Sequence, residues 1–111
     1  MITTPLRDTV ALNFLIPTLS NTGVPFAETH FADFERQVVD LTGGITRVGE
    51  VEGIWRTPDG GMQRERSRAY TTTVDARIAD RVAAELDVLI RSLFHQLAAF
   101  VQATPTRASA F

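Results

Sequence analysis

A long β-hairpin is the strongest structural signal in this sequence. The tripeptide Pro58-Asp59-Gly60 separates two runs of residues, 46–57 and 62–74, which we interpret as strands. Proline followed by aspartate and glycine is typical of a type I turn that continues into a left-handed residue. We therefore expect a three-residue loop with a bulge, and a loop of this length fixes which residues face each other across the hairpin.

The charges along the two strands support this register. The loop places Glu52 opposite Arg66 and Glu50 opposite Arg68, and each opposite-charge pair is worth about 0.2–1 kcal/mol. A slip by one residue would turn every side chain to the other face. One predicted face carries Val51, Gly53, Trp55, Gln63, Glu65, Ser67 and Ala69, and the other carries Glu50, Glu52, Arg56, Arg64, Arg66, Arg68 and Tyr70.

Periodic apolar residues outside the hairpin predict one more strand and two helices. Residues 9–16 alternate as a strand, and residues 27–42 repeat apolar side chains at helical spacing until Gly43 ends the helix. Asp75 is a suitable N-cap for a second helix that begins at Ala76. Its apolar stripe consists of Ile78, Val82, Leu86, Leu89 and Leu93.

The order of the elements predicts the fold. Residues 97–103 can either continue the second helix or form a last strand, and we prefer the strand because it completes the alternation. The order is then that of the α+β ferredoxin-like βαββαβ plait, a four-stranded antiparallel sheet with two helices on one face. We expect one ferredoxin-like domain over residues 1–111, with the first and third strands in the centre of the sheet.

Two further expectations follow from this fold. We expect the helices to cover the sheet face that carries Val51 and Trp55. The opposite face then shows Leu15, Ala11, Asn13, Ile54, Tyr70 and the arginines. The predicted buried core includes Phe14, Phe34, Val38, Trp55, Val82, Leu86 and Leu89.

The composition excludes several classes of function. The net charge is −2, which argues against a general electrostatic attraction to nucleic acid. Cysteine and lysine are both absent, so thiolate chemistry, disulfides and lysine Schiff bases are excluded. No apolar run approaches the roughly 20 residues of a membrane span. Residues 1–8 lack the pattern of a secretion signal, so we expect a cytoplasmic protein that binds neither membrane nor nucleic acid.

Several glycine positions and the tryptophan follow a recognisable pattern. It resembles the pattern GG-x-T … G-x-W … G … E of small uncharacterised bacterial ferredoxin-like proteins, whose architecture is distantly PII-like. The matching residues are Leu41-Thr42-Gly43-Gly44-Ile45-Thr46, Gly53-Ile54-Trp55, Gly60 or Gly61, and Glu65. Phe94-His95-Gln96 lies where that group has a Gln-containing strand, whereas Pro105 departs from the group in the last strand. The resemblance implies the fold and brings no activity with it.

Glu65 is the strongest candidate for a chemical role. The register places it opposite Gly53, on the face expected to lie under the helices, where desolvation raises the pKa of a carboxyl group. Such a group can act as a general acid or base, with His30 or His95 as the available histidines. The alternative is a structural hydrogen bond to Trp55 or to the glycine loop. The histidines have no metal-ligand spacing, so we expect neither a metal nor another cofactor.

Arg64, Arg66 and Arg68 follow one face of a strand, with Tyr70 next to them. Arginines in such a row can bind a small anion or a nucleotide on the sheet face. The alternative is that they pair with the glutamates of the neighbouring strand or contact another subunit.

These observations favour a non-enzymatic, oligomeric binding or regulatory domain. One alternative is a small cofactor-free enzyme of the dimeric plait type that uses Glu65 as acid or base. Another is a PII-like regulator that senses an anion or nucleotide. An uncovered sheet face and an edge strand favour association into a homodimer or a higher cyclic oligomer, and a different protein partner is a further option.

Overall fold

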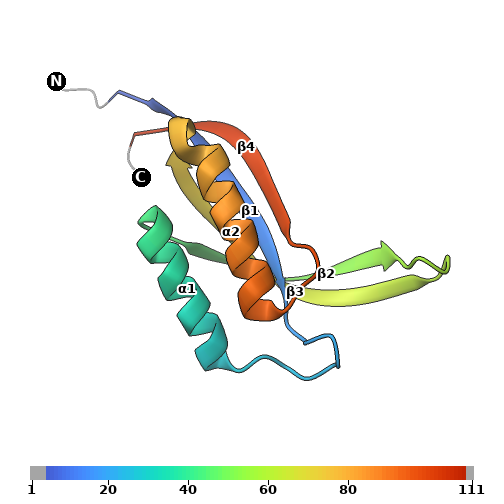
Figure 1. Ribbon diagram of the computed structural model, residues 1–111. Coiled ribbons are helices and arrows are strands. Elements are labelled where there is room, and N and C mark those ends of the chain that lie inside the picture. Colours follow the sequence, from blue (N-terminus) through green and yellow to red (C-terminus); the bar gives the residue numbers. More distant parts are fainter. Residues whose placement is uncertain (1–4, 110–111) are drawn as a thin grey trace.

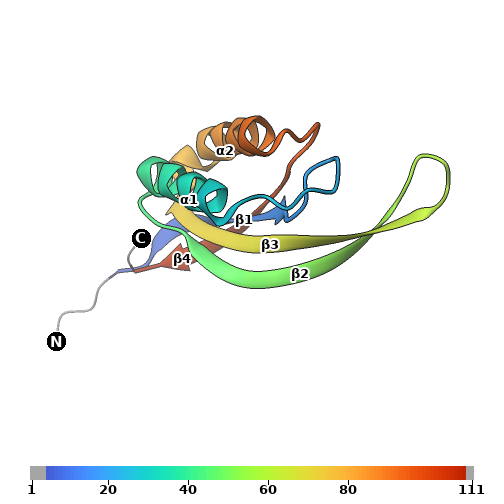
Figure 2. The same ribbon diagram turned by 90° about the horizontal axis from the view of Figure 1, so that it is seen from below.

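The computed structural model describes residues 5–109 and confirms the ferredoxin-like order of elements. The strands are β1 (Arg7–Pro17), β2 (Thr46–Arg56), β3 (Met62–Asp75) and β4 (Phe100–Ala108). The helices are α1 (Glu28–Thr42) and α2 (Ala79–Phe94), and a 3₁₀ turn, η1 (Ala76–Ile78), precedes α2. The antiparallel strands lie in the order β2-β3-β1-β4, and both helices cover one face of the sheet (Figures 1 and 2).

Hydrogen bonds of the backbone and of one capping side chain explain where the helices begin and end. Gly43 ends α1 with a left-handed φ of 89°, and its N–H donates to the Val39 carbonyl at 2.8 Å. The Asp75 carboxylate accepts from the Arg77 N–H, but the first turn is 3₁₀, so α2 begins three residues later than expected. The last strand runs over 100–108 rather than 97–103. Pro105 is tolerated there because β4 is an edge strand.

The hairpin register is confirmed. Glu52 lies opposite Arg66 and Glu50 opposite Arg68, and Gly60 is left-handed with a φ of 91°. The ion pairs form along diagonals of this ladder. They join Arg64 to Glu52 at 2.8 Å and Arg66 to Glu50 at 3.9 Å.

A β-bulge interrupts this register near the start of β2. The pairing shifts between Arg47 and Gly49, which leaves Val48 as an extra residue, and Gly49 adopts a φ of 148°. A bulge of one residue reverses the alternation of side chains along its strand. As a result Arg47 lies opposite Tyr70 and shares the helix side of the sheet with it.

The expected assignment of the hairpin faces is wrong. β1 pairs with β3 so that Phe14 lies opposite Tyr70, and this pairing places the even-numbered residues of β3 beneath the helices. These are Arg68, Tyr70, Thr72 and Val74. Trp55 and Glu65 therefore belong to the other set of alternating side chains, and Ile54 belongs to the same set as Tyr70.

The length of the hairpin explains this difference. Its outer part, residues 52–66, projects past the rest of the sheet, and we call it the arm (Figure 2). The helices cover only the inner part of β3, where Tyr70 and Val74 are the large apolar residues on one side. The alternation within the arm therefore has no influence on which face is buried.

Most of the predicted core is confirmed. Phe14, Phe34, Val38, Val82 and Leu86 are buried, and Leu89 packs partly buried against them. Trp55 was expected in the core but is 47% exposed on the arm. The structure also buries Phe31, which belongs to the apolar repeat of the first helix, and Ile90 and Phe94, which the sequence did not single out. Tyr70 was expected on the open face and is buried as well.

Two observations concern the cellular location expected from the sequence. No helix within residues 5–109 is long and apolar enough to span a bilayer. The expected lack of a secretion signal rests on residues 1–8, of which residues 1–4 lie outside the described part of the chain.

Truncation of Leu86 tests the packing of α2. Leu86 is fully buried in the main core cluster, so Leu86→Ala should lower the free energy of unfolding by about 2–5 kcal/mol in chemical denaturation. Val88→Ala on the exposed side of the same helix is the control and should change it by no more than about 0.5 kcal/mol. A loss below about 1 kcal/mol for Leu86→Ala would contradict the orientation of α2.

Candidate functional site

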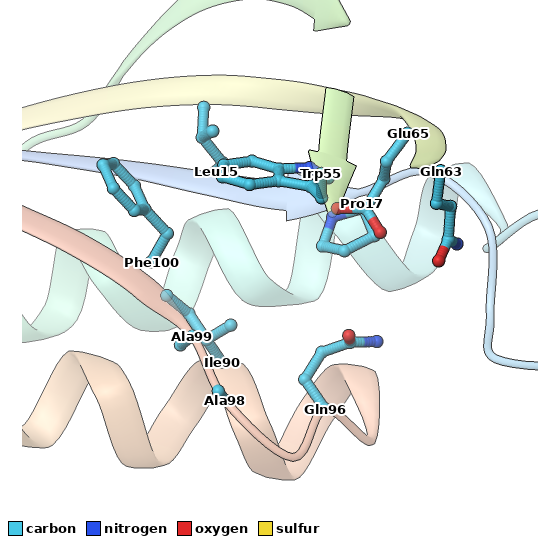
Figure 3. A pocket seen from close by; sticks show the side chains of 10 residues that line it. All are labelled: Leu15, Pro17, Trp55, Gln63, Glu65, Ile90, Gln96, Ala98, Ala99 and Phe100. Atoms are coloured by element: carbon cyan, nitrogen blue, oxygen red, sulfur yellow. The ribbon is translucent and has the colours of Figure 1, made fainter. Parts of the chain in front are cut away.

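A pocket of about 400 Å³ lies at the base of the arm, where β1 ends and β4 begins. We call it the Trp55 pocket. Figure 3 shows its two ends: the polar tips of Glu65, Gln63 and Gln96 lie at one end, and Leu15 and Phe100 lie at the other, with the Trp55 indole between them. The residues come from β1, both strands of the arm, α2, the connection from α2 to β4 and the first residue of β4. A concave site with an apolar wall and a few polar groups is the usual form of a small-molecule site.

Gly53 makes room for the Trp55 side chain. The two residues point to the same side of β2, and a Cβ atom at position 53 would lie 2.8 Å from Nε1 of Trp55. The indole therefore lies directly over the glycine. The spacing Gly53-Ile54-Trp55 has a direct structural role here, because a side chain at position 53 would displace the ring that forms one wall of the pocket.

Glu65 lies opposite Gly53, as the sequence predicts, and it alternates with the buried residues of β3 such as Tyr70, yet it lines a pocket to which α2 contributes Ile90. It is partly buried and lines the Trp55 pocket. Its neighbours along the strand, Arg64 and Arg66, pair with glutamates of β2. Within residues 5–109, no ion pair or side-chain hydrogen bond engages the Glu65 carboxylate.

A second pocket of about 440 Å³ adjoins the first. It lies between the loop that follows β1 and the outer part of β3, and it shares Pro17, Gln63, Glu65 and Gln96 with the Trp55 pocket. Glu65 therefore borders two neighbouring hollows at the base of the arm.

The histidines do not line the Trp55 pocket. The His30 ring stacks on Phe26 with 5.4 Å between the ring centres, and its Nε2 lies within hydrogen-bond distance of the Leu93 carbonyl. His95 ends α2 in a left-handed conformation and is exposed. The structure thus gives Glu65 no histidine partner within the pocket.

The predicted binding row of arginines is divided between two environments. Arg64 and Arg66 are exposed on the arm. Arg68 is buried under α1, where its guanidinium lies 3.9 Å from the centre of the Phe31 ring and pairs with Glu28. Ligand binding by this row, including Tyr70, stays a prediction, but the four residues do not share one surface.

Tyr70 belongs to a polar network that the sequence does not reveal. Its hydroxyl donates to Glu35 at 2.6 Å, and Arg47 donates to the same carboxylate oxygen at 2.7 Å. Burial and the hydrogen bond to Glu35 raise the pKa of Tyr70 to about 12. Burial opposes ionisation of Glu35, but the hydrogen bonds from Tyr70 and Arg47 outweigh it and lower the pKa of Glu35. The bulge at Val48 creates this contact, and no sequence pattern predicted it.

Residues 5–109 bring together no group of three or more histidine, aspartate or glutamate side chains that could hold a metal ion. The candidate site therefore consists of one carboxylate, two amides, an indole and apolar walls.

Known proteins resemble this chain in structure alone. No family model and no curated protein sequence matches it. CutA1 from Oryza sativa has a TM-score of 0.67 and 10% identity over 93% of this chain and 84% of that one. CutA from Synechococcus elongatus has a TM-score of 0.65 and 14% identity over 98% and 84%. The divalent cation tolerance protein CutA1 from Thermus thermophilus has a TM-score of 0.62 and 13% identity over 89% and 84%. At such identities the similarity shows the ferredoxin-like fold, and the resemblance to the GG-x-T … G-x-W group stays a prediction.

The titration of Tyr70 tests the buried network. Tyr70 is the only tyrosine, so the absorbance of tyrosinate against pH reports it alone. The midpoint should lie near 12 in the folded chain, above the ordinary value of 10.0. Because the folded-state pKa is raised, the stabilisation is complete below pH 10 and is lost as the pH rises through about 12. Glu35→Gln should lower the midpoint, and a folded wild-type midpoint near 10 would contradict the network.

Substitution of Gly53 tests the position of the indole. Gly53→Ala should displace the Trp55 ring and shift its fluorescence, and Trp55 is the only tryptophan. The free energy of unfolding should change by less than about 1 kcal/mol, because the ring lies on the exposed arm. Gly44→Ala is the control, since no atom lies within 4 Å of a Cβ there. Unchanged emission from Gly53→Ala would contradict the packing of Trp55 over Gly53.

Proposed function

We propose that this chain is an oligomeric binding or regulatory domain and that the Trp55 pocket is its ligand site. The observation that carries the proposal is the half-exposed Trp55 indole beside the partly buried Glu65, in a pocket of about 400 Å³. A large exposed aromatic residue in a concave site is typical of a surface that binds something. We take residues 1–111 as a single domain with a cytoplasmic location.

Self-association is the second part of the proposal. β2 and β4 form the two edges of the sheet, and strand edges pair readily with other strands. The arm adds exposed apolar side chains, of which Ile54 and Met62 are the largest besides Trp55. Edges and arm together suit a homodimer or a cyclic homo-oligomer of this chain, built through a sheet edge or the sheet face.

The chemistry of the pocket favours an organic ligand over a resident metal ion. The Thermus thermophilus neighbour is described as a divalent cation tolerance protein. In this chain the described residues provide no group of three or more metal-ligating side chains, and Glu65 is the only carboxylate among the residues that line the pocket. We therefore propose a small organic molecule as the ligand.

The alternatives have less support. An anion-sensing regulator needs arginines that are available to a ligand, but Arg64, Arg66 and Arg68 each pair with a glutamate. An enzyme that uses Glu65 would have to act without a histidine in the pocket. A binding role needs only the pocket and its polar groups.

Mass measurement in solution tests the oligomer. At micromolar concentration, sedimentation or native mass spectrometry should give a multiple of the 12.2 kDa chain mass. The double variant Ile54→Ser, Met62→Ser should shift the equilibrium towards the monomer without lowering the thermal midpoint of the isolated chain, because both side chains are exposed. A clean monomer at every concentration would overturn the oligomeric part of the proposal.

A further inference from the structure

We infer that the Trp55 pocket binds an organic cation, namely an ammonium or amidinium group that carries an apolar portion. This inference rests on the proposed function, because it specifies the ligand of the same pocket. Three features of the pocket carry it: its charge, its aromatic wall and its division into a polar and an apolar end.

The charge of the pocket is negative. Glu65 is the only charged residue among the described residues that line it. The nearest arginines along the strand are held by carboxylates of β2, at 2.8 Å from Arg64 to Glu52 and at 3.9 Å from Arg66 to Glu50. Two arginines of the arm thus have carboxylate partners, whereas the Glu65 carboxylate has none within residues 5–109. A partly buried carboxylate in this position attracts a cation and repels an anion.

The aromatic wall suits the same ligand. The Trp55 indole lies over Gly53 and remains about half exposed on the pocket side of the arm. Tryptophan is the aromatic side chain that interacts most strongly with cations, and the attraction grows when the cation is partly desolvated. A cation between the indole and Glu65 would be in contact with both.

The amides supply further acceptors. The Gln96 Nε2 atom donates to the Phe94 carbonyl at 2.8 Å, which leaves the amide oxygen of Gln96 to accept from a ligand. Figure 3 shows the tips of Gln96 and Gln63 at the same end of the pocket as Glu65. An ammonium group has several N–H donors and can use one carboxylate and neutral oxygens together.

The end of the pocket away from Glu65 determines which uncharged group the ligand can carry. Leu15 and Phe100 form an apolar surface there. A ligand that is charged at one end and apolar at the other matches this division, whereas a hydrated metal ion would leave the apolar end uncovered. The pocket volume of about 400 Å³ is sufficient for a small aromatic or branched amine.

Three probes of the same shape separate charge from apolar contact: benzylamine, benzyl alcohol and benzoate. Binding to the full chain is followed by the fluorescence of Trp55, the only tryptophan, and by calorimetry. Benzylamine should bind at least about tenfold more tightly than benzyl alcohol, and benzoate should bind most weakly. Glu65→Gln should reduce the preference for benzylamine over benzyl alcohol to the part that the Trp55 ring supplies, while binding of benzyl alcohol is retained.

Asp80→Asn is the control, because Asp80 is an exposed carboxylate in the first turn of α2, whereas that helix contributes to the pocket only through Ile90, further along it. It should leave the order of the three probes unchanged, and circular dichroism should give the same fold for both variants. Equal binding of the three probes, tighter binding of benzoate or no binding of benzylamine would overturn the inference. Binding of benzyl alcohol or benzoate in the pocket would still support the proposed ligand site. The proposed oligomer is tested separately, by sedimentation or native mass spectrometry.

Discussion

The pairing of β1 with β3 in the centre of the sheet determines the rest of the structure. Phe14 lies opposite Tyr70, and the two rings stack with 5.6 Å between their centres under the helices. Since side chains alternate along a strand, this one pair assigns every other residue of β3 to a face. It buries Arg68, Tyr70 and Val74 and directs Glu65 to the opposite side.

The extension of the hairpin beyond the helices creates the candidate site. Trp55 lies on the arm, past the point where β1 ends, and the arm projects beyond the rest of the sheet (Figure 2). Its indole folds back over Gly53 and reaches the ends of β1 and β4. The pocket therefore forms where the four-stranded part of the sheet gives way to two strands, and its walls come from segments far apart in the sequence.

The bulge at Val48 divides the charged side chains of the hairpin into two groups, one that contacts α1 and one on the arm. It turns Arg47 towards Glu35 and Tyr70, so these polar groups stabilise the contact between α1 and the sheet. The arm retains its own arginine–glutamate pairs on one face and leaves Glu65 on the other. The fold is shared with the CutA proteins, whereas the proposed ligand chemistry depends on the side chains of this chain.

The sequence by itself determined the features that depend on neighbours along the chain or across one tight turn. The order of elements, the end of α1 at Gly43, the loop at Gly60 and the position of Glu65 opposite Gly53 all belong to this class. Only the tertiary structure decided which face of the hairpin is buried, because that depends on the pairing of Phe14 with Tyr70 and on how far the helices extend. The sequence predicted Trp55 in the core, but it lines a pocket. The hydrophobicity of a tryptophan is compatible with either position, and which one it occupies depends on strands that are distant in the sequence.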